Sequence, residues 1–215
     1  MRASAAAVVP FVLAALIACQ HEETTTFPPG LAPLEPDPAP PPAATSTDQY
    51  PESLDLQQGS DAVSNYVHAT GYVDAPIEQV WTAMKNPAVV VDRHNITSYT
   101  VDWNVETGYD VSFRTDYVVD GIVDVDFDLT WREGVYGGSE ANPTVVSVVY
   151  QKTYGSSFVS YMAGSIELTA VNANVTELQF AQRMNATETD SNNIAAWTTE
   201  MFASIVATVH GQPLP

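Results

Sequence analysis

Apolar and polar residues alternate through most of residues 65–184, and a period of two is typical of half-buried β-strands. The turn-like breaks between most of the alternating segments are short, and short connections join antiparallel neighbours. A longer break is expected at Gly134–Pro143. The pattern predicts seven strands: Asn65–Asp74, Ile96–Glu106, Tyr109–Val119, Ile122–Arg132, Thr144–Tyr154, Phe158–Val171 and Val175–Met184.

Two segments instead show helical periodicity. Residues 76–85 (PIEQVWTAMK) begin with a proline, which suits a first helical turn, and Asn86-Pro87 ends the segment. A short second helix is expected over Ala88–Asp92. A long helix is expected over Asn193–His210, and residues 190–192 (DSN) offer N-cap side chains. Its apolar face carries Ile194, Trp197, Met201, Ile205 and Val209. The element order predicts an α+β fold with a curved sheet around the C-terminal helix.

One parity of the strands is consistently apolar and the other is polar, so the sheet is expected to be covered on one face only. The apolar face is rich in aromatic residues. These residues either fill a core or, because the sheet bends around one helix, line a cavity for a small molecule. The strand at 144–154 leaves the orientation of Lys152 open. The candidate ligand-binding residues are Trp103, Phe113, Tyr117, Phe127, Trp131, Tyr150, Phe180, Gln182, Met184, Trp197, Met201 and Ile205.

The segment IVDVDFDLTW places Asp124, Asp126 and Asp128 at a spacing of two residues. Such a row is compatible with a metal site, an acidic recognition face or the wet side of a sheet. Alternate residues of a strand lie about 6.6–6.8 Å apart. Because calcium holds its oxygen ligands at about 2.3–2.6 Å, three carboxylates in a straight row cannot share one ion. We therefore interpret the three aspartates as a solvated face, partly offset by Arg114 and Arg132.

The chain is strongly acidic: its 215 residues include 7 Lys+Arg and 26 Asp+Glu, for a net charge of -19. Such a chain repels nucleic acid and anionic bilayer surfaces, which argues against a module that binds DNA, RNA or a membrane surface. High net charge also favours solubility, and we expect a monomer. The length allows one ordinary domain with appendages.

The first nineteen residues have the layout of a secretory signal: Arg2, an apolar run, and the sequence LIAC ending at Cys19. LIAC resembles the lipobox of bacterial lipoproteins, in which the cysteine becomes the lipidated first residue of the mature chain. The resemblance implies a cell-envelope protein, and Gln20 after the cysteine implies the outer membrane, either periplasmic or surface-facing. The alternative is an uncleaved membrane anchor, but the apolar run is short and Pro10 interrupts it.

Residues 20–60 lack apolar periodicity, and nine of the fifteen prolines lie between Pro28 and Pro51. This composition predicts an extended, disordered tether. A protein-binding proline motif is the alternative reading. The expected organisation is a signal peptide over 1–19, a tether over 20–60 and a folded domain over 61–212.

The sequence HATGYVDAPIEQVWTAMKNP, residues 68–87, resembles the START/Bet v 1-like superfamily, also called SRPBCC or polyketide cyclase/dehydrase-like proteins. The resemblance implies a helix-grip fold: a seven-stranded antiparallel sheet around a long C-terminal helix, with two short helices after the first strand. Members bind lipids, sterols, polyketides or plant metabolites between sheet and helix. Some are cyclases, aromatases or hydrolases, with catalytic residues that vary between subfamilies.

The sequence holds no zinc-ligand set, no glycine-rich phosphate loop and no Gly-x-Ser-x-Gly motif, so we expect no metal and no cofactor. The compact polar cluster Asp92-Arg93-His94 is read either as a catalytic or gating group or as a surface loop. His68 has outward parity.

Three functions remain open at this point. The first is a lipid-anchored envelope protein, attached to the membrane through Cys19, that binds an apolar small molecule or lipid without catalysis. The second is a cyclase/dehydrase-like enzyme for an aromatic or polyketide-like substrate, with inward tyrosines, Lys152 or Gln182 as acid/base groups. The third is an acidic protein-interaction module.

Overall fold

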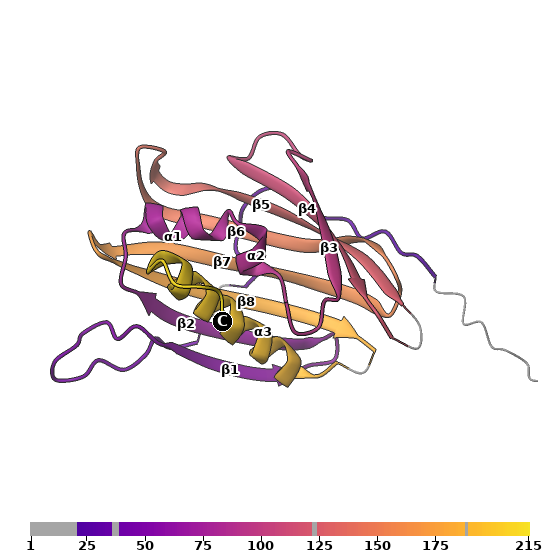
Figure 1. Cartoon of the computed structure of the whole chain (residues 1–215), viewed down its shortest axis with the longest axis horizontal. Helices are drawn as coiled ribbons and strands as arrows, with labels where there is room; N and C mark the ends of the chain where they lie inside the picture. Colours follow the sequence, from indigo (N-terminus) through magenta and orange to yellow (C-terminus); the bar gives the residue numbers. More distant parts are fainter. Residues whose placement is uncertain (1–20, 36–38, 122–123, 188) are drawn as a thin grey trace, which may run out of the picture.

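The computed structural model describes residues 21–35, 39–121, 124–187 and 189–215 (Figure 1). Within these ranges the chain forms eight strands and three helices. The strands are β1 (Leu54–Ser60), β2 (Asn65–Val73), β3 (Ser98–Trp103), β4 (Val111–Val119), β5 (Val125–Ser139), β6 (Asn142–Gly155), β7 (Val159–Asn172) and β8 (Val175–Ala186). The helices are α1 (Ile77–Met84), α2 (Pro87–Val90) and α3 (Ser191–Val209).

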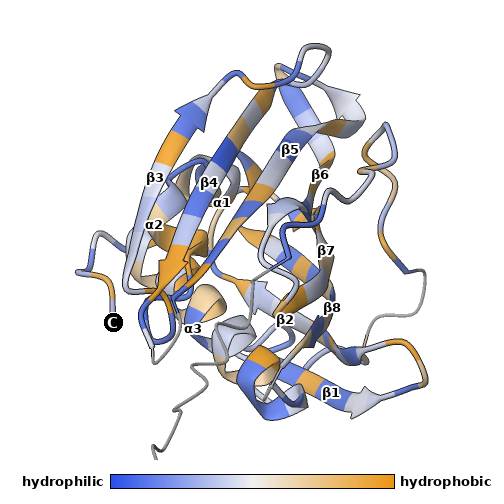
Figure 2. Ribbon diagram, turned by 90° about the vertical axis from the view of Figure 1, so that its right-hand side faces the viewer, coloured by the Kyte–Doolittle hydropathy of each residue, from blue (hydrophilic) through white to orange (hydrophobic). Residues whose placement is uncertain are grey.

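The strands form one antiparallel sheet in the order β1-β2-β8-β7-β6-β5-β4-β3. Figure 2 shows this sheet curving around α3, and the helices occupy its concave side. The fold class is therefore the predicted helix-grip arrangement of a curved antiparallel sheet and a C-terminal helix. The predicted meander is confirmed for β3–β8.

The predicted count of seven strands is wrong because β1 lies inside the segment that was expected to be tether. Leu54 pairs with Gly71 and Ser60 pairs with Asn65, so β1 extends the sheet beyond β2. Edge strand β1 buries little side-chain surface. Its hydrogen bonds to β2 hold it in the sheet, and a weakly apolar edge strand leaves little hydrophobic signal in the sequence. The folded part therefore begins at least seven residues before the predicted boundary at residue 61.

The predicted break at Gly134–Pro143 is also wrong, because most of it belongs to the long hairpin of β5 and β6. Gly134 pairs with Ser147, and Ser139 pairs with Asn142 at the hairpin end. Register shifts flank Gly137, where the glycines serve as β-bulges. Glycine marks a bulge as readily as a turn, so sequence pattern alone cannot separate the two.

The helices begin and end close to their predicted bounds. Asp190 is the N-cap of α3: its carboxylate accepts from the backbone N–H groups of Asn192 (2.8 Å) and Asn193 (3.3 Å). The Asn193 side chain accepts in return from the Asp190 N–H, which completes a capping box. The Asn86-Pro87 pair ends α1 and also begins α2, since the Asn86 side chain accepts from the Ala88 N–H.

The core lies between the concave face and the helices, as the alternation predicts. Four aromatic rings cross it in a continuous series of contacts from the sheet to α3. The rings of Phe113 and Trp131 are stacked with their centres 5.6 Å apart, the centres of the Trp131 and Tyr150 rings lie 4.4 Å apart, and the Tyr150 and Trp197 rings meet edge to face at 5.6 Å. The Tyr150 ring lies directly over Gly164, where an added Cβ would come within 2.3 Å of the Tyr150 hydroxyl. Gly164 is therefore required by the close approach of this ring.

Residues 21–35, here called the strap, lie on the outer face of the sheet. The Gln151 side chain donates to the Thr26 carbonyl (2.7 Å), the Ser147 hydroxyl donates to the Leu31 carbonyl (2.6 Å), and the Leu34 N–H donates to the Ser165 hydroxyl (2.8 Å). The expectation of a disordered tether is therefore wrong for these residues. Polar side chains of the outer face satisfy the backbone of the strap, which a search for apolar periodicity does not detect.

The strap also buries two groups of the outer face. Arg132 is ion-paired with Glu106, and its guanidinium lies 3.6 Å from the centre of the Phe27 ring. His68 faces outward, as predicted, and its ring lies 2.6 Å from the Glu35 carboxylate. The side chain of Arg132 is 5% exposed although it lies on the polar face. The outer face is therefore covered rather than solvated at this position.

Asp126 and Asp128 lie in β5 and belong to its outer face, as predicted. Asp128 lies opposite Asp116, and Arg114 lies between these carboxylates and that of Asp102. Burial and the Asp116 charge raise the pKa of Asp128 to about 6. Ile122 and Val123, which begin the strand predicted over Ile122–Arg132, lie outside the described residues.

In the described ranges, no helix is both long enough and apolar enough to cross a bilayer. Cys19 and the expected signal segment lie outside those ranges.

The close approach at Gly164 predicts the effect of one added methyl group. We expect Gly164→Ala to lower the free energy of unfolding by about 1–3 kcal/mol, because the buried Tyr150 ring has to move. Urea unfolding measures the change. In a Tyr150→Val background the ring is absent, and the same glycine substitution is expected to cost less than half as much. An equal cost in both backgrounds would contradict the assignment.

Candidate functional site

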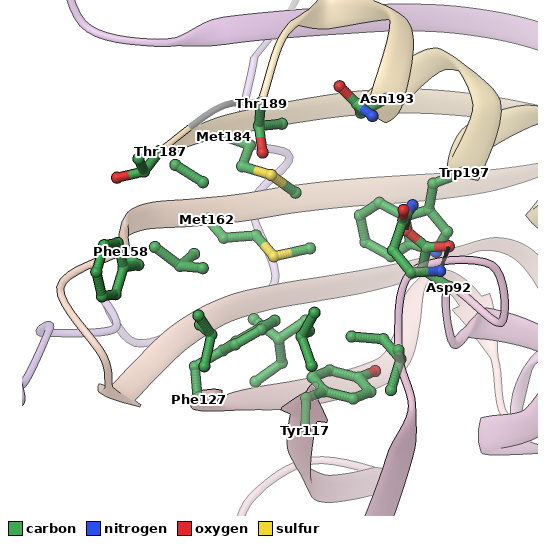
Figure 3. Close-up of a pocket in the computed structure, with 17 residues that line it drawn as sticks. Asp92, Tyr117, Phe127, Phe158, Met162, Met184, Thr187, Thr189, Asn193 and Trp197 are labelled. Carbon is green, nitrogen blue, oxygen red and sulfur yellow. Dashed lines mark hydrogen bonds between the residues drawn. The ribbon is translucent and has the colours of Figure 1, made fainter. Parts of the chain in front are cut away.

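A cavity of about 390 Å³ lies between the N-terminal half of α3 and one end of the sheet (Figure 3). Its walls come from the ends of β4, β5, β7 and β8 and from the loop between α2 and β3. The volume falls in the usual range of small-molecule sites, about 300–1,000 Å³. The lining residues are Asp92, Asn95, Ile96, Tyr117, Val119, Val125, Phe127, Leu129, Phe158, Val159, Met162, Met184, Ala186, Thr187, Thr189, Asn193 and Trp197.

The lining is apolar in its interior and polar at its rim. Tyr117, Leu129 and Trp197 are buried, whereas Asn95, Thr187 and Asn193 are exposed and mark the opening to solvent. The two methionines, at 162 and 184, point into the cavity from neighbouring strands (Figure 3). Methionine is flexible and polarizable, so this wall adapts to ligands of different shape.

The Tyr117 hydroxyl is the one buried polar group of the cavity wall that forms no hydrogen bond of ordinary geometry with the described residues, although the Thr115 and Trp131 side chains lie close enough to lower its pKa. Burial raises the pKa of Tyr117, which keeps the phenol protonated. A buried hydroxyl without a partner costs about 1–3 kcal/mol. A polar atom of a bound ligand would remove that cost by accepting or donating a hydrogen bond here.

The structure brings four of the twelve candidate ligand-binding residues to the cavity: Tyr117, Phe127, Met184 and Trp197. Trp103 is 49% exposed, because it lies near the end of edge strand β3, where its ring contacts Phe113 at 5.2 Å. The others are buried core residues that do not line the cavity: Phe113, Trp131, Tyr150, Phe180, Gln182, Met201 and Ile205. Alternation identified the inward face but not which part of it the helices leave open.

The residues that sequence reasoning missed are those of loops and strand ends. Phe158 and Val159 lie at the β6–β7 turn, Thr187 and Thr189 lie between β8 and α3, and Asn193 lies in the first turn of α3. Periodicity is undefined in such short connections. Only the topology could have indicated these residues, because an antiparallel meander places the β6–β7 turn and the start of α3 at the same end of the sheet.

Neither Lys152 nor Gln182 belongs to the cavity. A register shift between Asp128 and Leu129 turns Lys152 inward, where its ammonium donates to the carbonyls of Gly155 (3.2 Å) and Ser156 (3.0 Å). Burial lowers the pKa of Lys152. The Gln182 side-chain oxygen accepts from Thr198 on α3 (2.7 Å). Both side chains hold the structure together rather than face a ligand.

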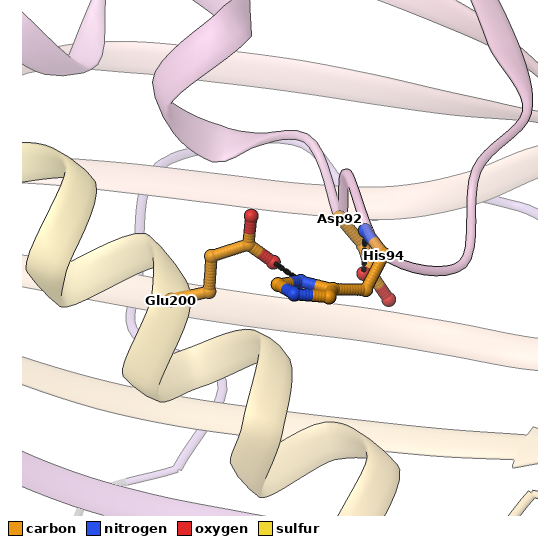
Figure 4. A group of neighbouring side chains, drawn as sticks. All are labelled: Asp92, His94 and Glu200. Atoms are coloured by element: carbon orange, nitrogen blue, oxygen red, sulfur yellow. Dashed lines mark hydrogen bonds and ion pairs between the residues drawn. The ribbon is translucent and has the colours of Figure 1, made fainter. Parts of the chain in front are cut away.

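The predicted polar cluster Asp92-Arg93-His94 fastens the rim of the cavity to α3. His94 lies 2.7 Å and Arg93 lies 2.8 Å from the two carboxylate oxygens of Glu200 (Figure 4). Asp92 accepts from the backbone N–H groups of His94 and Asn95, each at 3.2 Å. The ligand atoms of Asp92, His94 and Glu200 lie within 4.8 Å of one another, but each carboxylate is already engaged by these donors. The geometry supports a role in holding the loop.

Glu133 is a buried carboxylate on the inner face, at the end of the sheet away from the cavity. One oxygen accepts from the Trp81 indole N–H (2.7 Å), and the other has no hydrogen-bond partner among the described residues. Burial raises its pKa to about 7, although the nearby Lys85 ammonium, which lies over the Trp81 ring, opposes the shift. Its distance from the cavity, and not its pKa, argues against a role in ligand chemistry.

No family model and no curated protein matches the chain. Among solved structures, the lipid transfer and protein localization domain of human StarD13 matches with a TM-score of 0.50 and 14% identity, over 77% of this chain and 87% of that one. This chain has the START/Bet v 1-like fold.

Two further solved structures match with lower TM-scores. A STAR-related lipid transfer protein from Xanthomonas axonopodis matches with a TM-score of 0.46 and 9% identity, over 75% of this chain and 93% of that one. The Zhui aromatase/cyclase from Streptomyces sp. R1128 matches with a TM-score of 0.44 and 15% identity, over 69% and 92%. The likeness to the StarD13 domain, at 14% identity, shows the fold alone and does not identify a ligand or an activity.

The raised pKa of Glu133 predicts a pH-dependent stability. The pKa in the folded protein is about 7, against 4.5 for an unperturbed glutamate, so the folded state binds more protons than the unfolded state between these values. The free energy of unfolding therefore falls as pH rises from about 4.5 to about 7. Glu133→Gln keeps an acceptor for Trp81 and removes the charge. We expect it to be more stable than the wild type at pH 8, by roughly 2–3 kcal/mol, and nearly equal at pH 5.

Urea unfolding at the two pH values tests this expectation. Glu140→Gln, at the exposed end of the β5–β6 hairpin, serves as the matched control and should change neither value. A Glu133→Gln protein with the same pH dependence as the wild type would show that Glu133 titrates normally.

Proposed function

We propose that this protein is a lipid-anchored cell-envelope protein whose START-like domain binds a hydrophobic small molecule or lipid without catalysis. The observation that carries the proposal is the cavity of about 390 Å³, whose buried wall is apolar and includes one partnerless hydroxyl, that of Tyr117. Such a site suits a ligand with a long apolar part and one polar atom.

The engagement of the nearby polar groups supports binding over catalysis. General acid-base chemistry needs a titratable group within hydrogen-bond reach of the bound substrate. Asp92, the acidic residue of the lining, is committed to backbone N–H groups, and Lys152, which does not line the cavity, is committed to two carbonyls. Tyr117 is held protonated. These commitments weigh against the cyclase/dehydrase-like reading.

The likeness to the StarD13 domain supports a lipid as the ligand, since that domain is named for lipid transfer. The sequence supports the anchor: LIAC follows the apolar run directly, and Cys19 is the only cysteine of the chain. The proposed partners are therefore an apolar ligand in the cavity and the membrane at Cys19, in the outer membrane of the envelope.

Purification of the full chain from membranes tests both parts of the proposal. Mass spectrometry is expected to find a lipid-modified N-terminal peptide at Cys19 and a hydrophobic molecule released from the folded domain by organic solvent. Ala186→Trp places a large side chain in the cavity and is expected to abolish the released molecule. Ala173→Phe, in the exposed β7–β8 turn, is the control and should retain it. A domain that yields no ligand and binds none of a panel of fatty acids and sterols would sink the binding proposal.

Tyr117→Phe separates a ligand-binding hydroxyl from a structural one. We expect the affinity for dansyl-undecanoic acid to fall about fivefold, because one hydrogen bond to the ligand contributes on the order of 1 kcal/mol. The free protein should be as stable as the wild type or more stable, since the unpaired hydroxyl is gone. Fluorescence titration and urea unfolding measure the two effects. Tyr136→Phe, on an exposed part of β5, should change neither. A loss of stability without a loss of affinity would make Tyr117 structural.

A further inference from the structure

The strap fixes the start of the described chain against the domain. It runs along the outer face for its full length, and beside β6 it forms additional backbone hydrogen bonds, including one from the Thr25 N–H to the Thr153 carbonyl (3.0 Å). Because backbone pairing and the buried Arg132–Phe27 contact both hold it, the strap moves as a part of the domain.

The strap begins beside the cavity. Glu23 exchanges two backbone hydrogen bonds with Gly155 (2.8 and 3.1 Å), and the His21 carbonyl accepts from the Ser157 N–H (2.8 Å). The next residue, Phe158, lines the cavity. In Figure 1 the indigo start of the strap lies at the same end of the sheet as the β6–β7 connection.

Covalent geometry limits how far the anchor can be from this point. Cys19 is joined to His21 through Gln20 alone, and two residues span at most about 7 Å. A lipid on Cys19 is therefore attached next to the cavity end of the domain, and the 20–60 segment provides no spacer between membrane and domain.

We propose that the lipidated protein is held with the cavity end of the sheet against the bilayer, so that the cavity takes the hydrocarbon chain of a membrane lipid directly from the membrane. This inference rests on the proposed function and adds the source of the ligand and the surface that receives it. The receiving surface comprises the Asp92–Thr97 loop, the Gly155–Phe158 turn, Thr187 and residues 189–193. Phe158 and Ile96 are the apolar side chains of the cavity that lie in the turn and the loop.

Charge explains why this surface needs a covalent anchor. Glu22, Asp120, Asp124 and Asp190 are exposed at the same end, and the chain as a whole has a net charge of -19. Anionic bilayers repel such a surface. An anchor overcomes the repulsion by raising the local concentration of membrane lipid at the opening, which converts a bimolecular encounter into an intramolecular one.

The single cysteine allows a direct experiment. The mature chain 19–215 is coupled through Cys19 to maleimide lipid in phosphatidylcholine vesicles. The matched control is a Cys19→Ser/Glu140→Cys variant, which is coupled at the opposite end of the sheet. Hydrogen exchange measures which end the bilayer covers. The vesicles also contain a dansyl fatty acid and a non-exchangeable dabcyl phospholipid, so dansyl fluorescence rises as the probe leaves the quenched bilayer for the cavity.

We expect Cys19 coupling to slow exchange at least about fivefold in residues 92–97 and 155–158, with no change at the far hairpin ends, residues 104–110 and 139–142. The control should reverse this pattern. The rise in dansyl fluorescence should be at least about tenfold faster for Cys19 coupling than for the control, and slower when phosphatidylglycerol is added.

Each other result has a defined meaning. Equal exchange patterns or equal extraction rates for the two anchors would overturn the orientation, while solution binding of the same probe would leave the proposed function standing. Slowed hydrogen exchange at the cavity end together with no binding of the probe in solution would support the orientation and contradict the proposed binding function.

Discussion

The structure depends on a mismatch between the length of one helix and the area of one sheet face. Helix α3 has 19 residues and spans about 28 Å, whereas β5, β6 and β7 have 14 or 15 residues each and span about 48 Å. The helix α1 covers part of the remainder by packing on β6 and β7. The cavity lies at the ends of β4, β5, β7 and β8, where α3 contributes only Asn193 and Trp197 to the wall. The site is thus a consequence of incomplete coverage rather than of a special residue motif.

Strand alternation was enough to predict the parts of this fold that are set by burial. Phe113, Leu129 and Phe180 are fully buried on the predicted face, and the N-cap of α3 follows from the chemistry of Asp190. The errors occur where hydrogen bonding, and not burial, decides the structure. Strand β1 and the strap have few buried apolar side chains. The backbone of the strap forms hydrogen bonds with residues more than a hundred positions away in the sequence. A local pattern cannot reveal such partners.

The candidate site was predictable only in outline for the same physical reason. Four lining residues were predicted because they belong to the apolar face of a strand or helix: Tyr117, Phe127, Met184 and Trp197. The cavity lies over this part of the face. Trp131 and Tyr150 have the same pattern and are core. Whether an inward aromatic residue meets a ligand or a neighbour depends on where the helices end, which the sequence states only to within a few residues. The inward orientation of Lys152 depends on a bulge in β6, which shifts parity by one residue.

The strap also sets an order of events during folding. Synthesis delivers the N-terminus first, yet Leu34 hydrogen-bonds to Ser165, 131 residues later, and Thr26 hydrogen-bonds to Gln151. Contacts of such high sequence separation form slowly. The first described residues of the chain therefore wait for β6 and β7 before they can dock. In a chain already tethered at its N-terminus, the strap next to the attachment point would dock onto the outer face only after β6 and β7 have formed. Assembly of the outer face would then be the last step of folding.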